Sequence, residues 1–197
     1  MRAPALAVAA LAVLGTSTAF AADTPKFKVF GGLAYVAPLA EDDVDIGTVR
    51  DSIKASEELG WTVGIEARFN KVIGLEFDYV NATSDIEFGG QVIDDIHIQP
   101  LSATLNFHII PTEIVDFYFG PTASYFIWDD TDLGTGTEFK TDNDFAYGAS
   151  AGLEIGFGKT FALMGGIRWL KADLEPDGAP KIGIDPLISR LGVAFRF

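Results

Sequence analysis

The sequence predicts an all-β protein: an eight-stranded antiparallel transmembrane β-barrel with short periplasmic turns and long extracellular loops. Apolar and polar residues alternate along at least eight segments, which is the pattern of strands with two different faces. The connections between these segments are short turns and long polar loops in strict alternation. Mean hydropathy is positive although no segment after the N-terminus is apolar for the length of a spanning helix, which favours alternating strands in a bilayer.

The N-terminal segment has the three parts of a secretory signal peptide. Arg2 supplies the basic region, an apolar run follows from Ala3 to Leu14, and Ala19-Phe20-Ala21 forms a small-residue cleavage site. The alternative is a membrane anchor, but the apolar run is shorter than the roughly 18 residues that a spanning helix needs. We therefore assign residues 1–21 to the signal peptide and 22–197 to one barrel domain.

Composition excludes several classes of function. The chain has no cysteine and two histidines, so neither a disulfide scaffold nor a zinc site is expected, and we predict no metal and no cofactor. With Arg2 removed, 13 basic residues stand against 28 acidic ones. Nucleic acid is therefore not an expected partner, because binding it requires Lys and Arg on the phosphates.

The first four strands are predicted over residues 26–37, 59–69, 73–79 and 97–109. Long loops over 38–58 and 81–95 follow the first and third strands, and a short turn at 70–71 joins the second to the third. Before Pro100 the apolar positions change parity at Ile96 and Ile98, which predicts a β-bulge at the proline.

The last four strands are predicted over residues 115–128, 145–157, 161–169 and 187–197. Short turns lie at 111–112 and 158–160, and long loops lie at 129–143 and 175–185. The first and last strands must pair, because an unpaired backbone group in hydrocarbon costs several kcal/mol. The apolar positions of the terminal strand resemble the C-terminal signal that the outer-membrane assembly machinery reads: Leu191, Val193, Phe195 and Phe197.

The outward aromatic residues sort by depth into two girdles, as lipid headgroups favour. Phenylalanines lie near the short turns: Phe27, Phe69, Phe107, Phe117, Phe157, Phe161, Phe195 and Phe197. Tyrosines and tryptophans lie toward the long loops: Tyr35, Trp61, Tyr79, Tyr125, Tyr147 and Trp169. A soluble sandwich or lipocalin-like barrel is the alternative, but the other face is too small and glycine-rich to coat a protein surface.

The inward residues change character along the barrel. Near the short turns we predict a lumen plug of ion pairs, with a proton or ion path as the alternative, formed by Glu66, Arg68, Glu76, Asp78, His108, Asp116, Tyr118, Glu154, Arg168, Arg190 and Arg196. Toward the long loops the inward set is apolar and either lines a ligand pocket or packs the lumen: Ala34, Val36, Phe126, Trp128, Met164 and Leu170.

Catalytic and metal sites are weakly supported. His108 and Asp116 are symmetric about Thr112 and should face each other across a hairpin, but the inward serines Ser102 and Ser124 lie beyond hydrogen-bond reach of His108. We therefore predict no enzymatic activity. The acidic loops lack the ligand spacing of a calcium loop, so we interpret them as solvated surface rather than as sites for cations bound to lipopolysaccharide: Asp42, Asp43, Asp45, Asp129, Asp130 and Asp132.

The chain resembles the OmpW family of small outer-membrane proteins over its mature length. The resemblance rests on four stretches: HIQPLSATLNFH from His97, FYFGPTASY from Phe117, IRWLKAD from Ile167 and IDPLISRLGVAFRF from Ile184. It implies an eight-stranded barrel with a narrow, partly hydrophobic interior that passes or binds small hydrophobic molecules.

We therefore expect a bacterial outer-membrane barrel that binds or passively conducts small hydrophobic molecules. The alternative is a structural or surface-interaction protein with a plugged lumen, whose loops contact phage, bacteriocins or lipopolysaccharide. A lipid-modifying enzyme ranks third. The expected partners are outer-membrane lipid, lipopolysaccharide and the outer-membrane assembly machinery.

Overall fold

A computed structural model describes residues 26–39, 42–46, 49–55, 58–88, 91–112, 114–127, 131–132, 138–139, 145–174, 182–183 and 185–197. Eight strands form a barrel wall: β1 (Phe27–Pro38), β4 (Glu58–Arg68), β5 (Ile73–Phe88), β6 (Gln91–His108), β7 (Val115–Ile127), β10 (Phe145–Phe157), β11 (Phe161–Lys171) and β14 (Pro186–Arg196). Six shorter strands lie in the long connections: β2 (Asp42–Ile46), β3 (Val49–Ala55), β8 (Thr131–Asp132), β9 (Glu138–Phe139), β12 (Asp173–Leu174) and β13 (Ile182–Gly183). No helix among these residues is long and apolar enough to cross a membrane.

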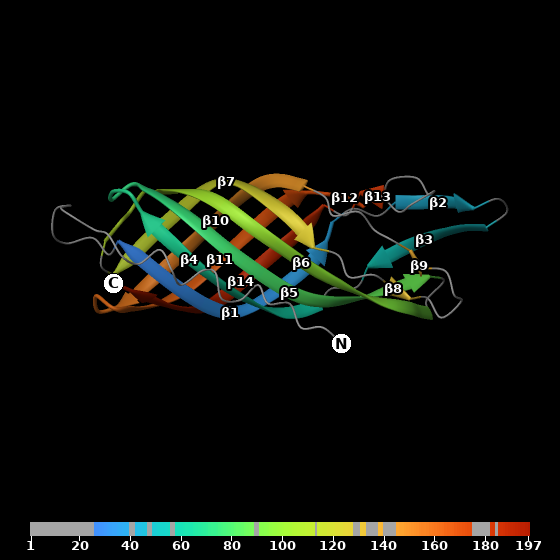
Figure 1. Cartoon of the computed structure of the whole chain (residues 1–197), viewed down its shortest axis with the longest axis horizontal. Coiled ribbons are helices and arrows are strands. Elements are labelled where there is room, and N and C mark those ends of the chain that lie inside the picture. The colour runs from blue at the N-terminus through green and yellow to red at the C-terminus, as the bar shows by residue number, and fades with distance from the viewer. Residues whose placement is uncertain are drawn as a thin grey trace.

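The barrel is closed by antiparallel pairing of its first and last strands. Each wall strand pairs with the next in sequence, and β1 pairs with β14 from Lys28↔Arg196 to Pro38↔Pro186. At the short-turn end of this pairing the backbone N–H groups of Lys26 and Phe27 each donate to the Phe197 carbonyl at 3.0 Å. The expected closure is confirmed, and Figure 1 shows the C-terminus at the short-turn end and the short strands β2, β3, β12 and β13 at the other end.

Successive residues of each wall strand point to opposite sides of the wall. Along β7 the residues Asp116 and Tyr118 are buried in the lumen, whereas their neighbours Phe117 and Phe119 are exposed outside. The outer surface carries large apolar side chains over its full circumference, with exposed fractions such as 64% for Val193. A continuous apolar surface of this extent requires an apolar surrounding.

Short turns connect the wall strands at one end of the barrel, as the sequence predicts. Between β4 and β5, the Asn70 side-chain oxygen accepts the N–H groups of Val72 at 2.7 Å and Ile73 at 2.9 Å. Between β6 and β7, the Thr112 hydroxyl donates to the Val115 carbonyl at 2.6 Å. Between β10 and β11, Gly158 takes a φ of 80°, which glycine adopts without the steric cost of a Cβ.

The long connections contain more strand than the sequence predicted. Residues 81–95 were expected to be a loop, but β5 and β6 continue as one hairpin to Phe88 and Gln91, and β3 pairs with β5 through Ile53↔Phe88. Backbone pairing continues there without the apolar alternation, because that alternation reports the environment of the two faces and not the hydrogen bonds.

The predicted bulge at Pro100 is wrong. The pairs Tyr79↔Leu101 and Ala82↔Ile98 share one register on either side of the proline, and the register shifts instead beyond Ile86. Ile98 and Pro100 are therefore both buried in the lumen. The parity of Ile98 was misread because the lumen at this height is itself apolar, so an apolar residue there does not mark the outer face.

Candidate functional site

The lumen is filled by two sets of side chains. The first, here called the ion-pair layer, consists of Lys28, Glu66, Arg68, Glu76, Asp78, His108, Asp116, Glu154, Arg168 and Arg190. Each of these side chains is at most 6% exposed. The second, here called the apolar ring, consists of Ala34, Val36, Val80, Ala82, Ile98, Phe126, Ala146, Leu170, Ala172 and Ile188. Inward parity places both sets in the lumen, and the direction of each strand places the ring nearer the long connections.

The ion pairs of the layer cross the bore. Arg168 on β11 donates to both carboxylate oxygens of Asp78 on β5, at 2.9 and 2.5 Å. These two strands are opposite each other, because three strands separate them on each side of the wall. Arg190 on β14 bonds Glu76 on β5 at 3.0 Å. The predicted pairing of the plug charges is therefore present, and it ties distant strands together.

Lys28 is the cation at the centre of the layer. Its Nζ lies 2.5 Å from Glu66, 2.6 Å from Glu154 and 3.6 Å from Glu76. Nζ also lies 4.9 Å from the centre of the Tyr118 ring, a cation–π distance. The predicted plug omitted Lys28, although its inward position on the first strand, facing an acidic set, was a usable signal.

His108 is held between two carboxylates. Its Nδ1 lies 2.9 Å from Asp116 and its Nε2 lies 2.7 Å from Glu66, while Arg68 bonds Asp116 at 2.5 Å. The contact with Asp116 was expected, but the register is not the expected one. His108 pairs across the hairpin with Tyr118, so Asp116 is a diagonal neighbour, because the hairpin is centred one residue later than predicted.

Arg196 lies apart from the other predicted plug residues. Its Nη2 donates to the carbonyl of Gly158 at 3.0 Å and to that of Phe161 at 3.4 Å, both at the β10–β11 turn. The position of Arg196 at the last residue of β14 places it at the short-turn end of the lumen.

Hydroxyl groups line the β6–β7 wall beside the layer. Ser102 and Ser124 bond each other at 2.8 Å, as do Thr104 and Thr122, and Arg168 donates to Thr104 at 3.3 Å. The serines thus contact each other and not His108, whose nitrogens both contact carboxylates. Among the described residues no group of three or more His, Asp or Glu side chains is arranged to hold a metal ion.

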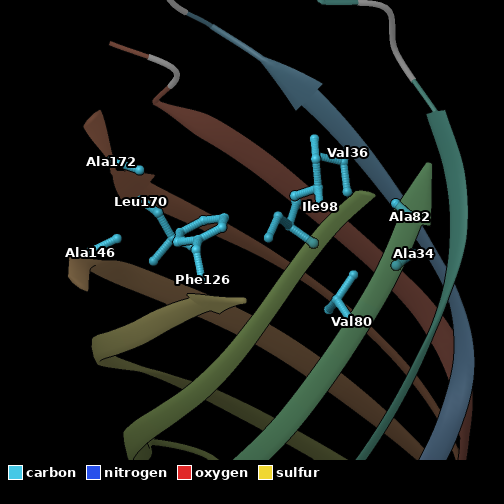
Figure 2. Packing of buried hydrophobic residues seen from close by; sticks show 10 residues of the cluster. Ala34, Val36, Val80, Ala82, Ile98, Phe126, Ala146, Leu170 and Ala172 are labelled. Atoms are coloured by element: carbon cyan, nitrogen blue, oxygen red, sulfur yellow. The ribbon is translucent and has the colours of Figure 1, made fainter. Parts of the chain in front are cut away.

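The apolar ring draws side chains from seven of the eight wall strands. Figure 2 shows them projecting from the strands toward the interior. Phe126 is 1% exposed and Leu170 has no exposed surface, so side chains occupy this section. Ala34, Val36, Phe126 and Leu170 were predicted to lie here, whereas Trp128 is outside the described residues.

Met164 is not part of the apolar ring, contrary to the prediction. It packs with a separate apolar group, Phe30, Ala162 and Ala194, on β1, β11 and β14. Met164 follows the β10–β11 turn by only four residues, which places it too near the short turns. The prediction also missed ring members such as Val80 and Ala82, because the third strand was ended at Tyr79.

A protein-family model described as "Outer membrane protein beta-barrel domain" matches residues 6–197. The chain belongs to this family. Its location is therefore the bacterial outer membrane, and the apolar outer face of the barrel contacts lipid. Among curated proteins, none matches the chain in sequence.

Several solved outer-membrane barrels share the fold. OprG from Pseudomonas aeruginosa is 15% identical, with a TM-score of 0.76 over 88% of this chain and 96% of OprG. AlkL, solved in lipid bilayers, is 16% identical, with a TM-score of 0.68 over 92% of this chain and 94% of AlkL. The outer membrane protein W of E. coli is 16% identical, with a TM-score of 0.56 over 90% of this chain and 100% of that protein. At these identities the likeness concerns the fold alone.

Proposed function

We propose that this protein is an OmpW-like barrel that binds small hydrophobic molecules in the apolar ring and conducts them passively into the membrane. The observation that carries the proposal is the position of the ring, a cluster of ten buried apolar residues that lies between the long connections and a layer of buried ion pairs. A molecule that enters from the long-loop end meets the apolar section first. Its burial there is favoured by about 25 cal/mol per Å² of apolar surface.

The ion-pair layer directs such a molecule away from the periplasm. Straight passage would separate pairs such as Arg168–Asp78, which cross the bore. Breaking a buried ion pair costs about 3–5 kcal/mol, and an apolar molecule cannot form hydrogen bonds or ion pairs with the separated charges. The molecule therefore leaves sideways, through the wall.

The β5–β6 ladder has two unpaired positions beside the apolar ring, as the β6–β7 ladder has nearer the short turns, between Thr104↔Thr122 and Phe107↔Phe119. Between β5 and β6 the pairing stops after Tyr79↔Leu101 and resumes at Ala82↔Ile98, and Pro100, which has no N–H, lies within this interruption. The ring residue Val80 lies within the interruption and the ring residue Ile98 lies at its end, both on the lumen side.

Side chains bridge the two strands on the outer face of the interruption. Tyr79 on β5 donates to the Gln99 side-chain oxygen on β6 at 2.6 Å, and within β5 the Asn81 side chain donates to the Tyr79 hydroxyl at 3.4 Å. Two backbone pairs are missing here and a neutral hydrogen bond contributes about 0.5–1.5 kcal/mol, so separating the strands costs less here than where the backbone ladder is continuous. We place the sideways exit at this point.

Binding of a neutral hydrophobic fluorophore, N-phenyl-1-naphthylamine, tests the ring. The full barrel in lipid nanodiscs should bind it above the level of empty nanodiscs, and Leu170→Asp should weaken this binding at least about tenfold, because it buries an unpaired carboxylate beside the ligand. Leu170→Met is the matched control and should bind normally. Equal binding by the Leu170→Asp variant would contradict the proposal.

A second candidate is supported by the filling of the ring. Val80, Leu170 and Ile188 have no exposed surface, so a ligand must displace side chains on entry. A permanently filled lumen would suit a structural or surface-interaction protein whose loops contact lipopolysaccharide, phage or bacteriocins. This function replaces the first if the wild-type barrel binds no fluorophore.

A further inference from the structure

Buried hydrogen-bonding atoms lie unpaired at the boundary between the apolar ring and the ion-pair layer. Among the described residues, no protein group bonds Nε of Arg168 or Nε and Nη2 of Arg190, nor the hydroxyls of Thr62 and Ser150. These side chains are buried, with exposed fractions of 0% for Arg168 and 4% for Arg190. An unmade hydrogen bond of a buried charged group costs more than that of a buried neutral group.

Strand register places the two arginines at the base of the ring. Arg168 on β11 pairs with Ile188 on the adjacent strand β14, and it precedes Leu170 by two residues on the same face. Arg190 pairs with Ala34 and follows Ile188 by two residues. Each arginine therefore has ring residues as its neighbours on the lumen face.

The two guanidinium groups are close together and held in place. Both approach Glu76 Oε1, at 3.6 Å from Arg168 and 3.0 Å from Arg190, and both contact Asp78. The carboxylates of Glu76 and Asp78 thus accept hydrogen bonds from some of the N–H groups of each guanidinium. The remaining N–H groups can only donate, so they need an acceptor.

We propose that the molecules bound by the apolar ring are amphiphilic anions, with the tail in the ring and a carboxylate head on Arg168 and Arg190. A carboxylate matches the planar donors of a guanidinium and supplies the acceptors that these N–H groups lack. This inference rests on the proposed function, since the ring must accept the tail. It adds the substrate class, which the ring alone leaves open between neutral and charged molecules.

Solid-state NMR of the full barrel in bilayers tests the position of the head. With ¹⁵N-labelled arginine in the protein, the carboxylate carbon of [1-¹³C]decanoate should show dipolar dephasing by guanidinium nitrogen. The labelled carbons of [1-¹³C]decanol and [1-¹³C]acetate should not. Dephasing of acetate as strong as that of decanoate would overturn the proposal in favour of a site for free anions. Absence of dephasing for decanoate would overturn it too, leaving hydration as the role of these donors.

Variants of the barrel separate a direct contact from a general loss of structure. Arg190→Gln combined with Glu76→Gln keeps the lumen charge unchanged and should weaken decanoate binding at least about tenfold relative to decanol. Lys171→Gln, which removes a partly exposed cation paired with Asp185, is the matched control and should keep wild-type binding. Decanol binding with no preference for decanoate would overturn this inference and retain the proposed function, whereas binding of neither would overturn both.

Discussion

Arg168 and Asp78 form a bidentate ion pair across the full bore of the barrel, with N–O distances of 2.9 and 2.5 Å between strands on opposite sides of the wall. Both side chains are almost completely buried. The pair therefore connects two strands, β5 and β11, that share no backbone hydrogen bonds.

Removing one partner of this pair should destabilise the barrel strongly. We expect Asp78→Ala to lower the free energy of unfolding by about 3–5 kcal/mol, because it leaves Arg168 buried with less compensation. The double variant Asp78→Leu/Arg168→Met should recover most of that loss, since two apolar groups need no partners. Reversible urea unfolding in bilayers measures both, and additive losses in the double variant would show that the pair is not coupled.

Lipid-facing substitutions should depend on depth. Leu105 is outward-facing and 37% exposed, and Leu105→Arg should cost about 2–4 kcal/mol near the bilayer midplane. Ile110, outward at the short turn between β6 and β7, should tolerate Ile110→Arg at about 0–1 kcal/mol. The same unfolding assay compares them, and equal costs would mean that the assigned depths are wrong.

Thr104, the lumen-facing neighbour of Leu105, is a poor position for an arginine substitution that would serve as a control for Leu105→Arg. Thr104 is completely buried, bonds Thr122 and accepts a hydrogen bond from Arg168 at 3.3 Å. Thr104→Arg would place a second guanidinium beside Arg168. We therefore expect Thr104→Val, which keeps the volume, to be the tolerated lumen substitution, with a loss of about 0.5–1.5 kcal/mol per hydrogen bond.

The terminal phenylalanine should be needed for assembly. Phe197 faces lipid and stacks on Phe27 at 6.0 Å, and its carbonyl accepts the N–H groups of Lys26 and Phe27 at the end of the β1–β14 ladder. Phe197→Asp should leave the protein in the periplasm and sensitive to protease. Phe157→Asp, another exposed phenylalanine at the short-turn end, is the matched control and should assemble. Heat-modifiable barrels formed by Phe197→Asp at wild-type yield would contradict the predicted assembly signal.

Locking the interruption at Pro100 should block transport. The register places Asn81 opposite Gln99, so Asn81→Cys/Gln99→Cys can form a disulfide between β5 and β6, and the chain has no other cysteine. We expect uptake of a hydrophobic dye by proteoliposomes to fall on oxidation and to return on reduction. The pair Ala123→Cys/Tyr147→Cys, across the continuous β7–β10 ladder, is the control and should leave uptake unchanged. Normal uptake by the oxidised Asn81/Gln99 pair would place the exit elsewhere.

Local patterns in the sequence determined the wall of the barrel. The facing of residues along β7 and β14 followed from the two-residue period, because that period is a property of each strand by itself. Pairing of β1 with β14 followed from the need to satisfy every backbone group within the membrane. The short turns could also be placed from the sequence, because their residues interrupt the alternation of apolar and polar side chains.

Only the tertiary structure decided which side chains meet inside the barrel. Lys28 contacts Glu66 and Glu154, which lie 38 and 126 residues further along the chain, and nothing in the alternation selects these partners. Met164 was misplaced for the same reason, whereas Ile98 was assigned to the wrong face because the lumen at its height is itself apolar. The height of a residue in the lumen depends on the tilt and stagger of all eight strands together, whereas its inward direction depends on its own strand alone. The sequence by itself therefore determined the direction of a side chain wherever the two faces of its strand differ in polarity, and the closed barrel determined its neighbours.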